Sequence, residues 1–220
     1  MKQRIEWIDM AKGLGIVLMI YGHIHFCYSP IKIWLCSFHM PLFFFLSGVT
    51  FNPFKYTNFK DYLENKTKTL LIPYMFFAFV ILCWRVVLQI IRYFNNGILF
   101  DFKLIFRQVL GIFLQIRGSD FGIGVWFLPC IFITFLLLYV INKLSKGNNL
   151  VKLVLGICCF CIGYFYCNYI GIKLPWGIDA AFVALLFMIL GHLYAEIAKN
   201  QPQLNDKKRL VVCIAGGGYL

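Results

Sequence analysis

The chain has 220 residues, of which 61% are hydrophobic and only 14% are charged, whereas a soluble domain carries about 25% charged residues. Its mean hydropathy is +0.77, and a soluble core of this size could not hide so many apolar side chains, so lipid is the expected solvent. The net charge of +12 does not indicate a nucleic-acid partner, because the basic residues gather between apolar stretches.

The charge-poor stretches predict an all-α fold, a polytopic integral membrane helical bundle with about six spans, since a spanning helix needs about 20 mostly apolar residues. The apolar stretch Gly97–Ile116 carries Asp101, Lys103 and Arg107, and is expected to be one additional interfacial or re-entrant helix. Residues 1–220 are expected to form a single membrane domain. The six predicted spans are residues 10–28, 33–51, 70–91, 122–142, 150–170 and 178–197.

The basic residues predict the orientation of this bundle. With a cytoplasmic N-terminus, four basic clusters lie on the cytoplasmic side, as the positive-inside rule expects. The region Arg85–Arg117 is the exception, because its five basic residues fall towards the outer side, and the sequence does not define its role. The four clusters are Lys2 and Arg4; Lys55, Lys60, Lys66 and Lys68; Lys143, Lys146 and Lys152; and Lys199, Lys207, Lys208 and Arg209.

The nine cysteines are expected to be apolar packing residues rather than metal ligands. Most of them lie inside apolar runs, and the cluster "CCFC" at residues 158–161 has no nearby histidine. We therefore expect no metal site in this chain.

The first predicted span carries ionisable residues at both ends, in "IDMAKGLGIVLMIYGHIH" (Ile8–His25). In a helix, the eleven steps from Lys12 to His23 leave a rotation of about 20° and a rise of roughly 16 Å, and Asp9 lies about 60° from Lys12. These three side chains therefore share one stripe. Asp9 and Lys12 could also be a pair at the membrane interface, with Lys12 snorkelling to the headgroups. His23 lies deeper in the span, where ionisable residues are functional candidates, and imidazole can accept and donate a proton near neutral pH.

A second motif, "FHMPLFFFLSG" (Phe38–Gly48), combines a histidine with a proline inside an apolar stretch. Pro41 is expected to break or kink a helix here, which frees backbone groups that can line a cavity. His39 precedes the proline, and Ser47 provides a small polar notch. The alternative for His39, which is equally open, is a simple hydrogen bond to a neighbour, whereas a serine such as Ser47 most often bonds back to its own helix.

Five segments in this order resemble signatures of the membrane acyltransferase 3 family, and especially of its fucose 4-O-acetylase-like branch. "WIDMAKGLGIVLMIYGH" is similar to the family's first-span signature, in which a basic residue is followed eleven positions later by histidine, here Lys12 and His23. Many members have arginine at the position of Lys12. Lysine keeps the positive charge of that arginine but does not have the fork geometry of its guanidinium. The other segments are "FHMPLFFFLSG" (Phe38–Gly48), "KTKTLLIPY" (Lys66–Tyr74), "VWFLPCIF" (Val125–Phe132) and "LPWGIDAAFVALLFMILGHLY" (Leu174–Tyr194).

The resemblance implies an enzyme that transfers an acyl group, usually acetyl, from cytoplasmic acyl-coenzyme A to a hydroxyl of a surface polysaccharide, a glycolipid or its lipid-linked precursor. His23 would be the general base or a transient acyl carrier. Lys12 would contact the phosphates of the donor, and Asp9 would hold Lys12. Lys66 and Lys68 are further candidates for the phosphates, although the positive-inside rule explains them at least as well.

The resemblance also implies supporting residues and a location. His39, Ser47, Trp126 and Asp179 are expected to line or support the cavity. Trp126 and Trp176 could stack on a sugar, but their places at predicted span ends also suit an aromatic belt. The expected location is the inner (cytoplasmic) membrane of a bacterial cell. The expected partners are membrane lipid, the carbohydrate acceptor and the acyl-coenzyme A co-substrate, with no metal and no nucleic acid.

Two other functions remain open from the sequence. A transporter or flippase could use His23 in a proton relay, although such proteins usually show paired repeats, and none is visible. The final apolar run, in "NDKKRLVVCIAGGGYL", is too short to span a membrane. The chain is therefore expected to be the N-terminal part of a longer family domain, and an inactive fragment is the third possibility.

Overall fold

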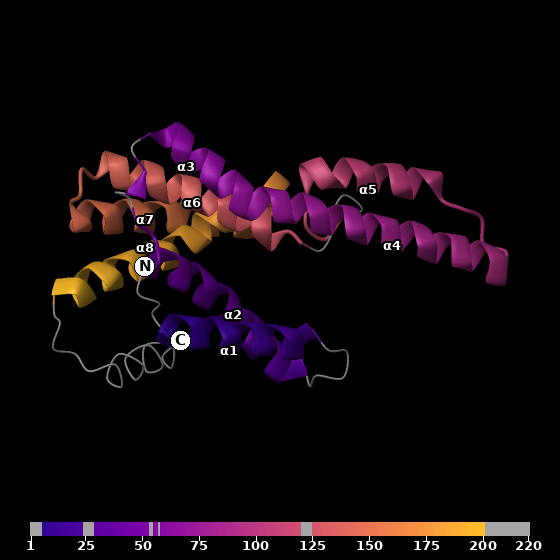
Figure 1. Cartoon of the computed structure of the whole chain (residues 1–220), viewed down its shortest axis with the longest axis horizontal. Coiled ribbons are helices and arrows are strands. Elements are labelled where there is room, and N and C mark those ends of the chain that lie inside the picture. Colours follow the sequence, from indigo (N-terminus) through magenta and orange to yellow (C-terminus); the bar gives the residue numbers. More distant parts are fainter. Residues whose placement is uncertain (1–5, 24–28, 53–54, 57, 120–124, 201–220) are drawn as a thin grey trace. The chain divides into compact units, whose positions relative to one another are not determined.

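The computed structural model describes residues 6–23, 29–52, 55–56, 58–119 and 125–200, and every regular element within these ranges is a helix (Figure 1). The predicted all-α fold is confirmed. Two π-helical turns, η2 (Thr67–Leu71) and η3 (Tyr166–Ile170), follow α3 and α7, and a 3-10 turn, η4 (Pro175–Gly177), precedes α8. The α-helices are α1 (Glu6–His23), α2 (Ser29–Val49), α3 (Phe59–Lys66), α4 (Ile72–Asn96), α5 (Phe102–Leu114), α6 (Phe127–Leu144), α7 (Asn149–Phe165) and α8 (Ile178–Asn200).

Four helical segments are long and apolar enough to cross a membrane, judged by length and composition. They overlap the last four predicted spans. The spans predicted first and second are also helical in their described parts, but α1 has three acidic or basic residues among its 18, and the apolar part of α2 is short. The four segments are Phe59–Asn96, Phe127–Leu144, Asn149–Ile170 and Pro175–Lys199.

Several predictions fall on residues outside the described ranges. These are the end of the first predicted span (residues 24–28), the start of the fourth (residues 122–124) and the terminal apolar run. The additional short helix expected within Gly97–Ile116 is present as α5, which has 13 residues and is shorter than the roughly 20 that a span requires.

The chain divides into two compact units. The first contains residues 1–52 and 186–220, and the second contains residues 53–185. Helix α8 therefore begins in the second unit and ends in the first.

Close helix contacts through glycine organise the first unit. At Gly15 of α1, an added Cβ would lie 3.2 Å from the ring of Phe43 on α2, so α1 and α2 are close there. An added Cβ at Gly48 of α2 would overlap the main-chain oxygen of Met188, and one at Gly191 of α8 would overlap that of Phe45. Each glycine thus lets the backbone of one helix touch the other, as small residues do between membrane helices.

Pro41 does not break α2, which excludes the break among the two expected outcomes, a break or a kink. The helix continues from Ser29 to Val49 with Pro41 inside it. A proline removes one main-chain N–H and leaves the carbonyl four residues earlier without that donor. The remaining main-chain bonds hold the helix together, because unpaired backbone groups are costly in an apolar environment.

In the second unit, Tyr62 joins the first turns of the long α3–η2–α4 helix to α6. Its hydroxyl donates a hydrogen bond of 2.7 Å to the main-chain oxygen of Phe135, and its side chain is buried. Its ring stacks on Tyr139, with 4.7 Å between the ring centroids. The ammonium of Lys66 lies 3.2 Å from the centroid of the Phe135 ring. The start of the long helix is thus fixed to α6 by both polar and aromatic contacts.

We expect Tyr62→Phe to lower the free energy of unfolding by about 1 kcal/mol, because a buried hydroxyl bond is lost while the ring contacts remain. Thermal unfolding in detergent measures the change. Tyr164→Phe is the control, since the Tyr164 ring is exposed on α7 and the same substitution should change the stability by less than about 0.5 kcal/mol. Equal unfolding temperatures for both variants would contradict the role given to Tyr62.

Helix α5 packs on α4 through Tyr74, whose hydroxyl donates a 2.6 Å hydrogen bond to the main-chain oxygen of Ile112. Tyr74, Ala78 and Ile112 form a small buried core between these helices.

Close packing of α7 on the start of α8 depends on Gly163, where an added Cβ would lie 2.9 Å from side-chain atoms of Phe182 and Val183. These contacts place the end of α5 and the end of α7 within one unit with the start of α8.

Candidate functional site

The predicted stripe on the first span lies on one uninterrupted helix, α1. The helical geometry therefore applies to the whole interval, and it places Lys12 and His23 on nearly the same face, roughly 16 Å apart along the axis. Lys12 is half-buried, and Asp9 and His23 are exposed. The side chains at both ends of the stripe are therefore not fully enclosed by the helices of the first unit.

The structure brings His23 together with His39, two candidates that the sequence placed on different helices. Their ring centroids are 6.2 Å apart, and the planes meet at 72°. His39 is 2% exposed, so the pair consists of one accessible and one buried imidazole.

Each of these histidines bonds to its own helix in the same way. Nδ1 of His23 lies 2.8 Å from the main-chain oxygen of Met19, and Nδ1 of His39 lies 2.7 Å from that of Leu35. A carbonyl oxygen only accepts hydrogen bonds, so Nδ1 must carry the proton in both rings. In the neutral imidazole, Nε2 then keeps its lone pair and can act as a proton acceptor.

The sequence analysis gave His192 no role, yet it is buried beside the Gly48–Gly191 crossing. Its Nε2 is 3.5 Å from a carboxylate oxygen of Glu196, and its ring meets the Phe51 ring at a centroid distance of 5.2 Å. Its place within "GHLY" was visible in the sequence, but nothing local indicated that it would be buried. Ser47 is half-buried on α2, and its main-chain oxygen accepts a hydrogen bond from the Thr50 hydroxyl.

Lys66 and Lys68, the further candidates for donor phosphates, belong to the second unit and have different surroundings. Lys66 is half-buried, and its ammonium lies over the Phe135 ring. Lys68 is exposed and forms a 2.5 Å ion pair with Glu64, one helical turn earlier. Of the two, only Lys68 therefore presents its charge to the exterior.

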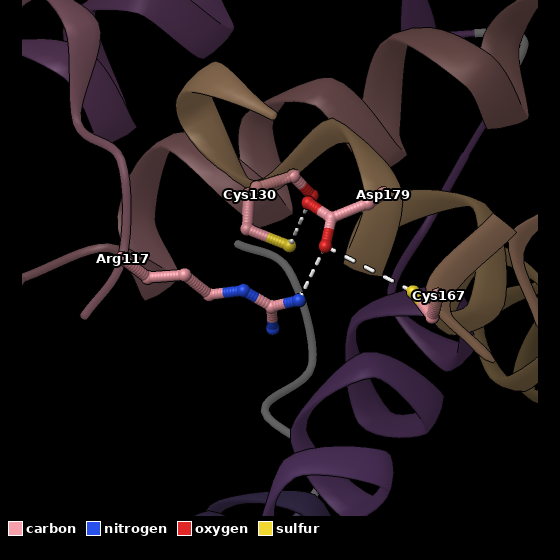
Figure 2. A network of polar contacts seen from close by, with 5 residues as sticks. Arg117, Cys130, Cys167 and Asp179 are labelled. Atoms are coloured by element: carbon pink, nitrogen blue, oxygen red, sulfur yellow. Dashed lines mark hydrogen bonds and ion pairs between the residues drawn. The ribbon is translucent and has the colours of Figure 1, made fainter. Parts of the chain in front are cut away.

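Trp126 and Asp179 belong to a polar cluster that the sequence did not predict. Figure 2 shows the Arg117, Asp179 and Cys167 side chains of this cluster. The guanidinium of Arg117 donates through Nη2 to Oδ2 of Asp179 and lies 5.2 Å from the centroid of the Trp126 ring. The thiol of Cys167 lies 3.9 Å from the same carboxylate oxygen, on the other side of it. The basic region Arg85–Arg117 was the one signal in the sequence that pointed to Arg117.

Local backbone geometry explains how this cluster is held. Trp176 has φ 58° and Gln115 has φ 42°, and residues other than glycine rarely adopt such positive φ angles. The main-chain N–H of Trp176 donates to the Gln115 oxygen at 3.2 Å, and its indole N–H donates to the Phe113 oxygen at 2.5 Å. These bonds tie the turn after α5 to the turn before α8, which brings Arg117 and Asp179 together.

Within the described ranges, no group of three histidine, cysteine or carboxylate side chains is arranged to hold a metal ion. The described residues thus include two groups of side chains that are candidates for catalysis or binding. The first is the α1–α2 group of Lys12, His23 and His39, and the second is the Arg117–Asp179 cluster with Trp126.

The described residues thus form a helical protein with four segments able to cross a membrane, and its first helix carries Lys12 and His23 on nearly one face. The sequence profile of the acyltransferase 3 family, described as an acyltransferase domain, matches residues 5–220. The chain belongs to this family, and it is a multi-pass membrane protein. The family resemblance of the five segments is thereby confirmed.

One similar protein is the nodulation protein NolL of Mesorhizobium japonicum. It is 26% identical to this chain over 149 residues, which are 63% of this chain and 36% of NolL. The matched region thus covers little more than a third of that relative. No solved structure matches the chain.

Proposed function

We propose that this protein is a membrane-bound O-acyltransferase that moves an acyl group, with acetyl as the expected group, from acyl-coenzyme A to a sugar hydroxyl. The expected acceptor is a surface polysaccharide or a glycolipid of the bacterial envelope. The observation that carries the proposal is the contact of His23, which shares α1 with Lys12, with His39 of α2, in a chain of the acyltransferase 3 family.

The chemistry assigns His23 as the general base. Its Nε2 accepts the proton of the acceptor hydroxyl while the hydroxyl oxygen attacks the thioester carbonyl carbon. The new C–O ester bond forms, the C–S bond breaks, and the proton passes from the imidazolium to the departing thiolate. His39, which is buried beside His23, packs against that ring and restricts its position.

Lys12 is proposed to bind the donor. Its ammonium attracts the phosphates of coenzyme A, and the pantetheine arm then extends along α1 towards His23. Asp9, about one turn earlier, orients Lys12. Lys68, in the second unit, is a separate candidate for a donor phosphate, because its charge is exposed, whereas Lys66 lies over an aromatic ring.

The proposed location is the inner membrane with a cytoplasmic N-terminus. This orientation follows from the positive-inside distribution of the basic clusters. It places Lys12 near the cytoplasm, where acyl-coenzyme A is present, and the turns before α6 and α8 on the outer side, where surface glycan is present.

Lys12 variants test the proposal through the donor. We expect Lys12→Ala to raise the KM for acyl-coenzyme A by about tenfold or more, because an ammonium–phosphate contact is worth roughly 1.5–3 kcal/mol. Lys12→Arg should retain most of the affinity, since it preserves the charge. The assay follows transfer of radiolabelled acetyl from acetyl-coenzyme A to host glycan in membranes that contain the protein. An unchanged KM in Lys12→Ala, or equal losses in both variants, would contradict donor binding by Lys12.

A further inference from the structure

We infer that the Arg117–Asp179 cluster with Trp126 is a binding site for a hydroxyl group of the glycan acceptor. This inference rests on the proposed acyltransferase function, because it names the residues that hold the acceptor. Figure 2 shows the cluster, with the Arg117 guanidinium directed at the Asp179 carboxylate.

The cluster has unused hydrogen-bonding capacity in buried positions. The Asp179 side chain is 2% exposed, and its Oδ1 has no hydrogen-bond partner among the described residues, although Oδ2 takes the contacts from Arg117 and Cys167. The Arg117 Nε is also buried, and none of the residues that the structure describes provides an acceptor for it. Unsatisfied groups of this kind are rare and costly in folded proteins, so a partner is expected for them.

A sugar hydroxyl has the chemistry that both atoms require. It can donate its proton to a carboxylate oxygen such as Oδ1 and can accept an N–H such as that of Arg117 Nε, whereas a purely donating or purely accepting ligand can do only one of these. The Arg117 side chain is 28% exposed, so the cluster is in contact with the exterior through part of this side chain. The half-buried Trp126 ring beside it offers an apolar face to the C–H groups of a sugar.

The charge of the cluster favours a neutral sugar over the acyl donor as its ligand. The Asp179 carboxylate neutralises the Arg117 guanidinium and would repel the phosphates of acyl-coenzyme A. A neutral polyhydroxyl ligand meets no such repulsion.

The backbone supports a binding role. Gln115 and Trp176 both have positive φ, and each such residue costs of order 1–3 kcal/mol unless its surroundings hold it. Two hydrogen bonds of Trp176 and the Arg117–Asp179 pair join the same two turns, which keeps the cluster rigid. These turns also face the outer side in the proposed orientation, where the glycan lies.

The test uses Asp179→Asn, with Asp101→Asn as the matched control. Asp101 is an exposed carboxylate in the same unit that caps α5 by accepting the Leu104 N–H, and asparagine caps a helix equally well. The probe is surface polysaccharide purified from a host strain that lacks the gene. Its affinity for the solubilised protein is measured by tryptophan fluorescence, and its KM is measured in the acetyl-transfer assay.

We expect Asp179→Asn to raise the Kd and the KM for this polysaccharide by about tenfold or more, while the KM for acetyl-coenzyme A changes by less than about twofold. Asp101→Asn should match the wild type in all three values. An unchanged polysaccharide Kd in a folded Asp179→Asn protein would overturn the inference. The cluster would then be a structural ion pair whose remaining polar atoms bind water. If Asp179→Asn does not fold, Arg117→Lys provides the same comparison, because it keeps the charge but removes Nε.

The two hypotheses fail in different ways. If the wild type binds the polysaccharide and Asp179→Asn does not, but neither transfers acetyl, the proposed function fails and the binding site stands. If the wild type transfers acetyl and Asp179→Asn does so with an unchanged polysaccharide KM, the proposed function stands and the inference is overturned.

Discussion

His23→Ala should reduce acyl transfer by roughly 10²–10⁴-fold, the contribution that a positioned general base typically makes. The substituted side chain has no group that can take the proton from the acceptor hydroxyl. The loss should appear in kcat, whereas the KM for acyl-coenzyme A should change little, because the donor contacts of Lys12 remain. Initial rates of radiolabelled acetyl transfer in membranes with equal amounts of each protein measure the effect.

Two further variants show whether His23 acts through its imidazole. His39→Ala should reduce kcat by a smaller factor than His23→Ala, since it removes the neighbouring ring but not the base. Tyr21→Phe is the control on the same helix, because Tyr21 is exposed and has no place in the proposed site. A His23→Ala protein with the kcat of Tyr21→Phe would show that His23 is not the base.

Gly191→Ala should destabilise the first unit by about 3 kcal/mol, the upper part of the range for overpacked positions. The new methyl would overlap the main-chain oxygen of Phe45, and backbone cannot move aside as a side chain can. Gly48→Ala should have a comparable effect, because its methyl would overlap the oxygen of Met188 on the other helix. Unfolding temperatures in detergent measure both.

Gly13→Ala is the matched control for these two substitutions. Gly13 also lies within a helix of the first unit, but nothing lies within 4 Å of an added Cβ. Alanine should therefore stabilise the helix by roughly 0.5–1 kcal/mol, since glycine loses more conformational freedom on folding. Equal unfolding temperatures for Gly13→Ala and Gly191→Ala would contradict the close crossing of α2 and α8.

Much of the fold could be predicted because membrane thickness fixes the length of an apolar helix. The boundaries were less accurate where a helix continues beyond its apolar part. The span predicted at residues 70–91 belongs to a helical segment that runs from Phe59 to Asn96. Its first turns are polar, so hydropathy alone could not include them. α1 similarly begins at Glu6, where acidic residues in the first turn favour a helix N-terminus.

The candidate site could be predicted only where it depends on local geometry. Lys12 and His23 lie on one helix, so their shared face follows from the helical repeat. The contact between His23 and His39 depends on how α1 and α2 pack, which the sequence did not specify. Arg117 and Asp179 are 62 residues apart, and their pairing depends on which helix ends meet. Gln115 and Trp176, in the turns that bring them together, have positive φ without being glycine, so their identity does not mark these conformations in the sequence.

The central claim is that His23 enables transfer of an acyl group to a surface glycan. The most direct measurement is the alkali-labile ester content of that glycan in a strain that lacks the gene and carries either the wild-type or the His23→Ala copy. We predict that the wild-type copy restores the ester, whereas His23→Ala yields the same amount of exported glycan without ester, although the protein is present in the membrane. Unchanged ester in the His23→Ala strain would contradict the claim, and loss of exported glycan instead of ester would identify a transporter.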